Sequence, residues 1–388
     1  MKLIVNQKAL EKVLAHANWI VEKKQAVPIL GYVLFDAEVG KGLTITSTNM
    51  DMTMVDTAPC DVTEGGKYCL PAGLLYDITK KLETGTDITF EFLKESNSIE
   101  MRSKRASFSI HYIESSNFPP IAEADYPVSF LMNASVLKQA IDVAKVAMLQ
   151  DNSRFHLNGI HMHYENSSGR SKMRFVATDL FRIACVSTDV SDDAREMPPV
   201  IVSKRTVSEI LKLVDSGDGD VKISVSDNRI SFDVVASDGI STRFGARLVN
   251  GTFPEYAAAL EVTNNKLLTL NTGEILEALD RVSTVVVDST NSVRLQITAD
   301  KLTVSGVSQE FGSATEEIDA SFSVLEPMKI CFNSKYLIEI LKEIETPHVT
   351  MLLAESNSST IIKPVATDGA PDVDMIFAVM PIEVVTDG

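Results

Sequence analysis

Three stretches of the sequence repeat one pattern: Lys2–Val13 reads KLIVNQKALEKV, Ser129–Ala140 reads SFLMNASVLKQA, and Leu267–Ala278 reads LLTLNTGEILEA. Each stretch predicts a short apolar strand, then an Asn (Asn6, Asn133 or Asn271), then an amphipathic helix. The copies are separated by roughly the length of one ordinary domain. The sequence therefore predicts three similar domains, and repetition at this scale indicates that function depends on the shape of the assembly.

A second strand-then-helix unit recurs later in each third of the chain. It reads CLPAGLLYDITKKL from Cys69, VSKRTVSEILKL from Val202 and FNSKYLIEILKE from Phe332. About eight strands per third, most of them alternating, accompany these two helices. We therefore expect an α+β fold in which each domain places two helices on one face of antiparallel sheets. The Pro-rich, acidic stretch Ser115–Tyr126 and the stretch Asn250–Tyr256 predict domains at 1–125, 126–256 and 257–388.

Length and composition restrict the class of protein. A chain of 388 residues exceeds what a single hydrophobic core usually supports, and 45% hydrophobic residues is typical of soluble globular proteins. No apolar run approaches the roughly 20 residues of a membrane helix, and the first residues resemble a strand, not a signal peptide. The four cysteines have no C-x-x-C spacing, which favours reduced thiols and a cytoplasmic location.

The net charge of −17 argues at first against a nucleic-acid partner. The charge is uneven, however, because the six helical windows 7–24, 72–83, 134–150, 203–215, 272–284 and 333–345 sum to +1 and the remainder to −18. Basic pairs occur at Lys23–Lys24, Lys80–Lys81 and Lys204–Arg205. Two interpretations stay open: helices simply favour solvated Lys, or the helices form a surface that is spared from the negative charge.

Few residues suggest catalysis. His161 and His163 would share one face of a strand and, with Asp179 or Asp151, form a metal site for a hydrolase. The carboxylate pairs Asp218/Asp220 and Asp372/Asp374 are more typical of turns and strand ends. None of the common catalytic motifs is present, which favours a structural or binding role without catalytic residues, cofactor or metal. The apolar segment Phe377–Ile382 is either a core strand that ends in a kink or a groove for a partner peptide.

Six short motifs occur in one order along the chain: VPIL at Val27–Leu30, LNG at Leu157–Gly159, ATD at Ala177–Asp179 with Arg182, FPEY at Phe253–Tyr256, VRL at Val293–Leu295 and VMP at Val379–Pro381. In these motifs, and in its three repeats, the chain resembles the bacterial sliding clamps, the beta subunits of DNA polymerase III, from residue 1 to about 384. The resemblance implies a non-enzymatic processivity factor: a head-to-tail homodimer forming a closed ring of six domains around duplex DNA. The implied partners are the DNA, the second copy, the DNA polymerase III alpha subunit, the clamp loader and other proteins with a clamp-binding motif.

The resemblance also implies which residues act. Those near the DNA-facing positions of the family are Lys24, Lys80, Lys81, Gln150, Lys204 and Arg205. Those at the family's pocket between domains two and three are Leu157, Thr178, Leu180, Phe181, Arg182, Ile183, Pro254, Asn333, Tyr336, Ser359, Val379, Met380, Pro381 and Ile382. Three features depart from the family: ATDLFR replaces ATDGHR, Ala258 and Ala259 replace larger residues, and Glu383 stands where a basic residue is frequent. We therefore expect the pocket to prefer a somewhat different peptide.

Ring closure requires an exposed strand edge at each end of the protomer. We expect these edges at Ser103–His111 and Lys301–Val307. One alternative to a clamp is the metal-dependent hydrolase that uses His161, His163 and Asp179. The other is a repeat scaffold that binds peptides but no DNA.

Overall fold

The computed structural model describes residues 1–21, 27–93, 97–121, 125–151, 154–167, 169–215, 219–261, 263–286, 290–366 and 373–382. The repeated Asn of the sequence is the N-cap residue that starts a helix in each third. Strands β1 (Lys2–Asn6), β11 (Val128–Asn133) and β19 (Lys266–Asn271) lead into helices α1 (Gln7–Ile20), α3 (Ala134–Lys145) and α6 (Thr272–Ser283). The Asn6, Asn133 and Asn271 side chains accept hydrogen bonds from backbone N–H groups of the first turn at 3.1, 3.0 and 3.1 Å. Each cap satisfies a donor that has no partner within the helix.

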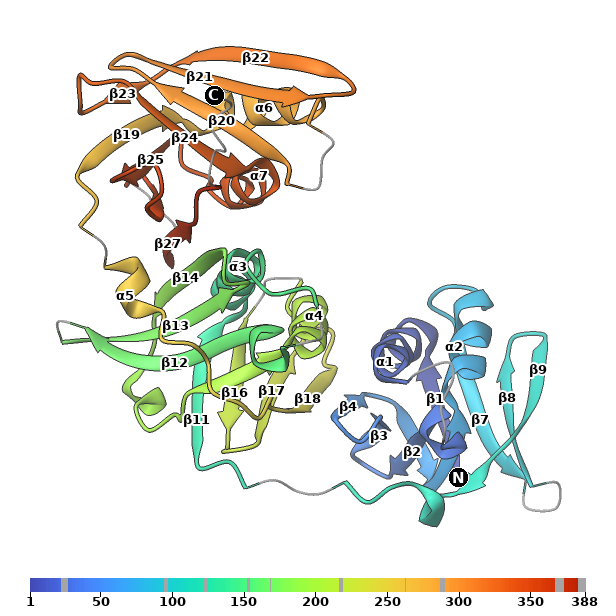
Figure 1. Cartoon of the computed structure of the whole chain (residues 1–388). Coiled ribbons are helices and arrows are strands. Elements are labelled where there is room, and N and C mark those ends of the chain that lie inside the picture. Colours follow the sequence, from blue (N-terminus) through green and yellow to red (C-terminus); the bar gives the residue numbers. More distant parts are fainter. Residues whose placement is uncertain are drawn as a thin grey trace. The chain divides into compact units, whose positions relative to one another are not determined.

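The second unit of each repeat also forms as predicted. Strands β6 (Gly66–Pro71), β15 (Val200–Ser203) and β24 (Met328–Asn333) lead into α2 (Ala72–Lys81), α4 (Lys204–Leu213) and α7 (Ser334–Lys342). The helices are shorter than the predicted windows, and α1 ends at Ile20, not at residue 24. In the first repeat α1 and α2 pack side by side, as α6 and α7 do in the third (Figure 1). No helix of the described ranges is long and apolar enough to cross a membrane.

Every strand pairing of the described residues is antiparallel, in four sheets ordered β5-β1-β7-β8-β9, β10-β6-β2-β3-β4-β18-β17-β16-β11, β15-β12-β13-β14-β27-β26-β25-β19-β23 and β22-β21-β20-β24. The α+β architecture is therefore confirmed. The remaining elements are β2 (Tyr32–Glu38), β3 (Gly42–Thr48), β4 (Met52–Ala58), β5 (Asp61–Glu64), β7 (Asp87–Leu93), β8 (Ser98–Ser103), β9 (Ala106–His111), β10 (Ile113–Glu114), β12 (Gly159–Ser167), β13 (Arg170–Thr178), β14 (Arg182–Asp189), β16 (Asp220–Val225), β17 (Arg229–Val235), β18 (Ser241–Arg247), α5 (Ala257–Leu260), β20 (Ser292–Ile297), β21 (Lys301–Ser308), β22 (Gly312–Asp319), β23 (Ser321–Phe322), β25 (His348–Leu353), β26 (Thr360–Pro364) and β27 (Val373–Val379).

Two expectations about strands were wrong. The alternation of Leu43–Val55 predicts one strand, but a turn at Asn49–Asp51 separates β3 from β4. Lys301–Val307 is not an edge, because β21 pairs with β20 on one side and with β22 on the other. In the described residues the two edges of that sheet are β22 and β24. The expected edge near Ser103–His111 is correct, since β9 ends its sheet in the described part of the chain.

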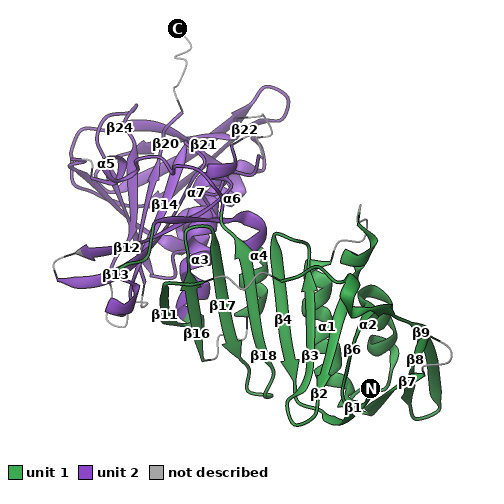
Figure 2. Ribbon diagram, turned by 90° about the horizontal axis from the view of Figure 1, so that it is seen from below, with its two compact units in different colours: residues 1–135, 196–198, 208–248 green, residues 136–195, 199–207, 249–388 purple. Residues whose placement is uncertain are grey.

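The chain divides into two compact units. Unit 1 contains residues 1–135, 196–198 and 208–248, and unit 2 contains 136–195, 199–207 and 249–388 (Figure 2). Within unit 1, β4 of the first repeat pairs with β18 of the second. Within unit 2, β14 of the second repeat pairs with β27 of the third. Each unit therefore contains one junction at which a sheet continues from one repeat into the next.

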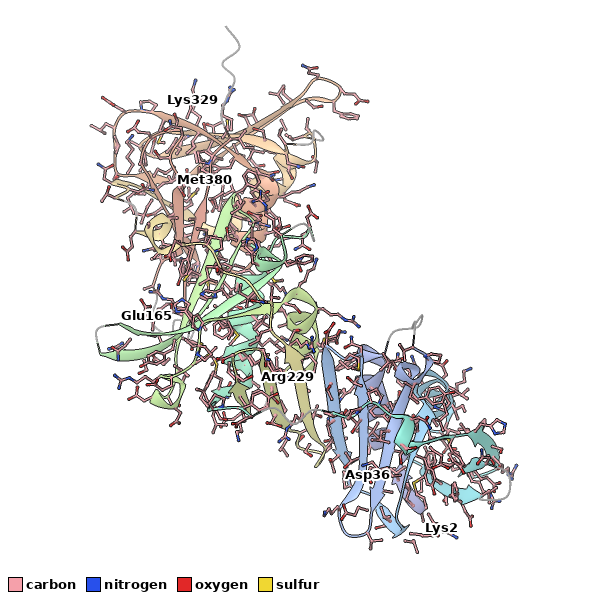
Figure 3. The ribbon with its side chains drawn as sticks, turned by 60° about the horizontal axis from the view of Figure 1, so that its bottom comes forward. Lys2, Asp36, Glu165, Arg229, Lys329 and Met380 are labelled. Carbon is pink, nitrogen blue, oxygen red and sulfur yellow. The ribbon has the colours of Figure 1, made fainter. Side chains whose placement is uncertain are left out.

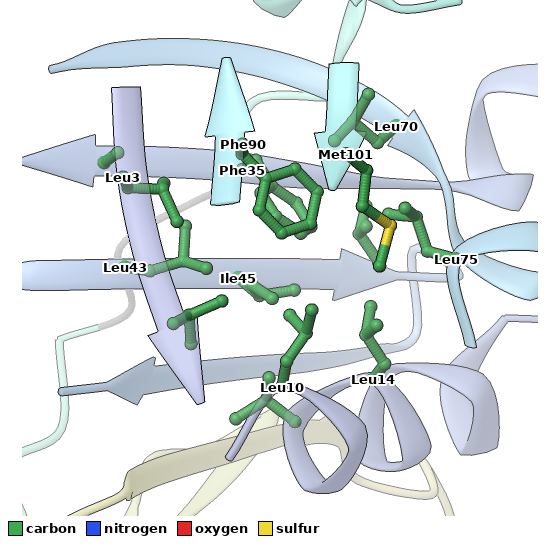
Figure 4. Close-up of a cluster of buried hydrophobic side chains, with 14 of the residues drawn as sticks. Leu3, Leu10, Leu14, Phe35, Leu43, Ile45, Leu70, Leu75, Phe90 and Met101 are labelled. Atoms are coloured by element: carbon green, nitrogen blue, oxygen red, sulfur yellow. The ribbon is translucent and has the colours of Figure 1, made fainter. Parts of the chain in front are cut away.

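The core of the first repeat lies between its helices and sheets (Figure 4). Leu3 points inward from β1, while Leu10 and Leu14 lie one turn apart on α1. The rings of Phe35 and Phe90 lie 5.7 Å apart across the core. Complete burial of such a side chain contributes about 2 kcal/mol to stability.

Candidate functional site

The junction of repeats two and three gathers most of the predicted pocket residues. β14 runs antiparallel to β27, with Arg182 opposite Val379 and Ile183 opposite Ala378. Beyond the paired strands, the Met380 N–H donates to the Phe181 carbonyl at 2.8 Å. Two segments that are distant in the sequence therefore lie side by side.

The turn that enters β14 is fixed by its own side chains. Thr178 Oγ1 accepts from the Leu180 N–H at 3.0 Å and donates to the Arg182 carbonyl at 2.8 Å. Asp179 Oδ1 accepts from the N–H groups of Phe181 and Arg182 at 3.0 and 2.9 Å. Leu180 adopts a φ of 76°, a left-handed conformation that is unfavourable for a residue with a Cβ atom. The hydrogen bonds of Thr178 and Asp179 hold the turn in this strained conformation, which fixes the backbone that carries the Leu180 and Phe181 side chains.

Three large apolar side chains at this junction are exposed. Leu180, Phe181 and Met380 expose 49%, 60% and 47% of their surface. A single exposed apolar side chain needs no explanation, but three on neighbouring backbone segments form a patch typical of a binding site. Met380 can adapt to ligands of different shape because its side chain is unbranched.

Arg182 connects this turn to α7. Its side chain is only 7% exposed and its Nε donates to Asp179 Oδ2 at 3.0 Å. Nη1 lies 2.6 Å from Glu339 Oε2, and the guanidinium lies 4.3 Å from the centroid of the Tyr336 ring. Burial, aided by the nearby Asp179, raises the pKa of the Tyr336 hydroxyl. Glu339 was missed by the sequence analysis because no local pattern indicates a partner so far away in the chain.

Apolar residues around Ile183, two positions after Phe181, form one cluster. Leu157 and Phe253 are buried in it, and Ile183 packs against it. Pro254 follows Phe253 directly and is half-buried. The other buried members of the cluster are Val176, Cys185, Ile201 and Tyr256. The two motifs LNG and FPEY therefore meet in one apolar cluster, against which Ile183 of β14 packs.

The remaining predicted pocket residues have more limited roles. Asn333 caps α7 by accepting from the Lys335 N–H at 3.0 Å, and the Ser359 carbonyl accepts from Asn264 Nδ2 at 2.8 Å. Ser359 directly precedes Thr360, which pairs with the buried Val379. Pro381 and Ile382 are half-buried, and the Ile382 N–H donates to the Cys331 carbonyl at 2.8 Å.

The histidines proposed as metal ligands have other neighbours. The His161 ring stacks on Phe253, with centroids 4.7 Å apart, and His163 Nε2 lies 2.7 Å from the Tyr256 hydroxyl. Burial, together with His163, lowers the pKa of His161 to about 4. Asp179 is engaged by Arg182. Within the described ranges no three His, Cys, Asp or Glu residues are placed to hold a metal ion, and nothing there supports the hydrolase alternative.

The basic residues predicted to face DNA lie at helix ends. Lys80 and Lys81 are exposed in the last turn of α2, and Lys80 Nζ lies 5.8 Å from the centroid of the Tyr76 ring. Lys204 Nζ donates to Gln150 Oε1 at the start of α4, beside the exposed Arg205. The structure thus brings Gln150 and Lys204 together, whereas Lys24 lies outside the described residues.

Comparison with known proteins covers almost the whole chain. Models of the N-terminal, central and C-terminal domains of the DNA polymerase III beta subunit match residues 1–122, 131–255 and 260–378. The beta sliding clamp of Caulobacter vibrioides is 29% identical over 384 residues, which cover 99% of this chain and 100% of the relative. The beta sliding clamp of Escherichia coli K12 is 28% identical over 383 residues, which cover 98% and 100%.

Solved structures give the same result. The chain is similar to the sliding clamp of Bartonella birtlesii bound to griselimycin, with a TM-score of 0.90 and 29% identity over 99% of this chain and 100% of that one. It is also similar to the Pseudomonas aeruginosa clamp bound to griselimycin, with a TM-score of 0.89 and 28% identity over the same shares. Both structures contain a ligand on a protein of this fold.

Proposed function

This chain belongs to the DNA polymerase III beta subunit family, and we propose that three features of its own residues perform the work of a sliding clamp. The protein is a non-catalytic processivity factor that encircles duplex DNA and tethers the polymerase and other partners to it. The three features are a ring closed through two strand edges, helices spared from the negative charge, and one apolar site for partner peptides.

We propose that the ring closes between β22 of one copy and β9 of the next. If β5, β10 and β23 are left aside, the described residues of each repeat form eight strands. The fourth is β4, β14 or β22, and the eighth is β9, β18 or β27. Within the chain, the fourth strand of one repeat pairs with the eighth strand of the following repeat, as β4 with β18 and β14 with β27. By the same rule β22 would pair with β9 of a second copy, which gives a head-to-tail dimer.

Charge supports this pairing. The residues at and before β9 include the exposed cations Arg102, Lys104 and Arg105. β22 carries Glu316, Glu317 and Asp319. Within one chain these groups have partners of their own, such as Glu100 for Arg102 and Arg281 for Glu316. Complementary edges would speed association and disfavour pairing of two identical edges.

We propose that the helix-borne cations hold DNA loosely. Lys80 and Lys81 stand at the end of α2, and Lys204 and Arg205 stand at the start of α4, where Lys204 contacts Gln150. Lys24 is assigned to this set by the family resemblance. Contacts from Lys and Arg to phosphate carry no sequence information, so a ring that uses them can slide. The low charge of the helices keeps the attraction weak in a chain of net charge −17.

We propose that the patch of Leu180, Phe181 and Met380, beside the cluster of Leu157 and Ile183, receives the clamp-binding motif of partner proteins. The observation that carries this assignment is the exposure of three large apolar side chains at one repeat junction. The expected partners are the DNA polymerase III alpha subunit, the clamp loader and other proteins with such a motif. The bulk of Leu180 and Phe181 favours a peptide with smaller apolar residues at that wall.

Retention on DNA tests the proposed ring. After loading by a clamp loader onto nicked circular DNA, the protein should remain bound through gel filtration and dissociate once the circle is linearised. The variant Lys104→Glu/Arg105→Glu should lose retention because like charges would face each other across β9 and β22. The exposed Lys329→Glu on β24 is the control. Equal dissociation of wild type from circular and linear DNA would contradict ring closure.

Two further points remain proposals. We retain 1–125, 126–256 and 257–388 as the domains, supported by the ranges that the family models match. We place the protein in the cytoplasm, because its four cysteines are all unpaired thiols and bacterial chromosome replication takes place there.

A further inference from the structure

A row of small residues crosses the sheet of unit 1. Five adjacent strands, β4, β18, β17, β16 and β11, run side by side there (Figure 2). One residue of each strand is the register partner of the next, in the order Thr53, Gly245, Ser231, Ser224 and Ser129. Since none of them carries a side chain longer than Thr, the sheet surface is lowered along this row.

The row forms the floor of a cavity of about 590 Å³. Ile121 and Tyr126, which lie between the first two repeats, contribute to its lining. The Tyr126 hydroxyl reaches the glycine of the floor, because a Cβ atom placed on Gly245 would lie 3.9 Å from it. A volume of this size falls within the range of about 300 to 1,000 Å³ that is typical of small-molecule sites.

The charge around the floor is positive. The lining includes Lys222, Arg229 and Arg243, against one carboxylate, Asp233 (Figure 3 labels Arg229). This excess of cations contrasts with the net charge of −17 for the chain. Arg243 Nε donates to Asp233 Oδ1 at 2.6 Å, but a guanidinium has five N–H donors and can serve a second acceptor.

Polar groups in the floor are not all satisfied within the protein. The Ser129 and Ser224 hydroxyls pair with each other at 3.1 Å. The Ser231 hydroxyl is buried and makes no hydrogen bond of ordinary geometry, although it is close enough to Tyr126 to lower the pKa of that phenol slightly. Burial raises the pKa of Tyr126, while Arg229 and Arg243 oppose the rise. A buried hydroxyl without a hydrogen-bond partner is destabilising, and a bound acceptor would remove that cost.

We propose that this cavity binds a small organic oxyanion, a phosphate- or carboxylate-bearing molecule of mononucleotide size or smaller. The oxyanion would lie against Arg229 and Arg243, with the Ser231 and Tyr126 hydroxyls as further donors. The less polar body of the ligand would contact Val55 and Ile121, which also line the cavity. This inference rests on unit 1 alone and does not depend on the clamp function.

Isothermal titration of the full-length protein in phosphate-free buffer tests the proposal, with inorganic phosphate, dAMP and citrate as separate probes. At least one probe should bind saturably at one site per chain, with an affinity that falls as salt is added. A preference for dAMP or phosphate over citrate would identify a phosphate ligand, and the reverse order a carboxylate. No saturable binding of any of the three would overturn the proposal.

Two kinds of variant locate the site. Gly245→Val should reduce affinity at least tenfold, because its side chain fills the floor without contacting other backbone atoms closely. Arg229→Gln/Arg243→Gln should also reduce affinity at least tenfold. Because it changes no core residue, it tests the site even if Gly245→Val does not fold. Lys329→Gln removes a positive charge from the exposed surface of β24 and should have no effect. The proposal is wrong if the cavity variants bind like wild type, or if Lys329→Gln weakens binding equally.

Discussion

The two junctions between repeats have the same backbone conformation but different side chains. The turn Thr48–Met52 precedes β4 in unit 1, and the turn Thr178–Arg182 precedes β14 in unit 2. In the first, Thr48 Oγ1 accepts from the Met50 N–H at 3.0 Å and donates to the Met52 carbonyl at 2.9 Å. Thr178 makes the same two bonds to Leu180 and Arg182.

The likeness extends to backbone strain and strand pairing. Met50 and Leu180, each at the third position of its turn, have φ angles of 77° and 76°. The Asp51 carbonyl accepts from the Arg247 N–H at 2.8 Å, as the Phe181 carbonyl does from Met380. Both turns are therefore copies of one local structure, inherited through the repeat.

Two pairs of side chains at matching positions differ in character, although Met50 and Leu180 are both apolar and exposed. Asp51 and Arg247 are exposed and form an ion pair at 3.8 Å, whereas Phe181 and Met380 are apolar. Asn49 and Met52 stand where the second junction has the ion-paired Asp179 and Arg182. The repeat therefore determines the backbone conformation of a junction. A few side chains then decide which junction binds a partner.

The largest expected effect comes from replacing the buried ion pair of Asp179 and Arg182 by the residues at the matching positions of the first junction. Arg182→Met leaves the Asp179 carboxylate buried without its cation, which should lower the local free energy of unfolding by about 3 kcal/mol. Asp179→Asn/Arg182→Met recreates the Asn49/Met52 pair of the first junction and should recover most of the loss. Hydrogen exchange of the β14 and β27 amides measures both.

The matched control for this exchange is Arg247→Met at the first junction. The Arg247 side chain is exposed, so its removal should change stability by less than about 0.5 kcal/mol. If Arg182→Met were equally mild, the ion pairs of Arg182 would contribute no stability and the proposed contrast between the junctions would be wrong.

The next effect concerns binding. Phe181→Asp/Met380→Arg gives the second junction the charged pair of the first, while both backbones keep their hydrogen bond. Affinity for a labelled clamp-binding peptide of the DNA polymerase III alpha subunit should fall about 100-fold, equivalent to roughly 2.7 kcal/mol, in a fluorescence anisotropy titration. Asp51→Asn/Arg247→Gln should leave that affinity unchanged. Unchanged binding by the charged variant would place the peptide site elsewhere.

The features predictable from sequence are those with a local signal. Asn6, Asn133 and Asn271 mark helix starts because an N-cap acts within one turn, and the alternation of Leu3 and Val5 shows which face of β1 is buried. The repeated order of such signals was sufficient to predict three α+β copies. The family resemblance then supplied the candidate pocket residues, of which the β14–β27 pairing brings together Arg182, Ile183 and Val379.

Features that depend on distant pairing were not predictable. β21 and β22 are consecutive strands of one sheet, and only the pairing of β21 with the distant β20 shows that β22, not β21, forms the edge. Glu339 gives no sign of its contact with Arg182, and the small residues of the cavity floor become a row only through strand register. The break between β3 and β4 was missed because Met50, not Gly, occupies the left-handed position of the turn.

The smallest expected effect tests that shared strain. A left-handed φ costs a residue with a Cβ atom about 1–2 kcal/mol, and Gly offsets part of the gain by loosening the unfolded chain. Met50→Gly and Leu180→Gly should therefore each stabilise their own junction by about 0.5–1 kcal/mol, measured by hydrogen exchange at β4 and β14. Only Leu180→Gly should also weaken peptide binding, because only that side chain belongs to the apolar patch. If Leu180→Gly left peptide affinity as unchanged as Met50→Gly does, the Leu180 side chain would not contact the peptide.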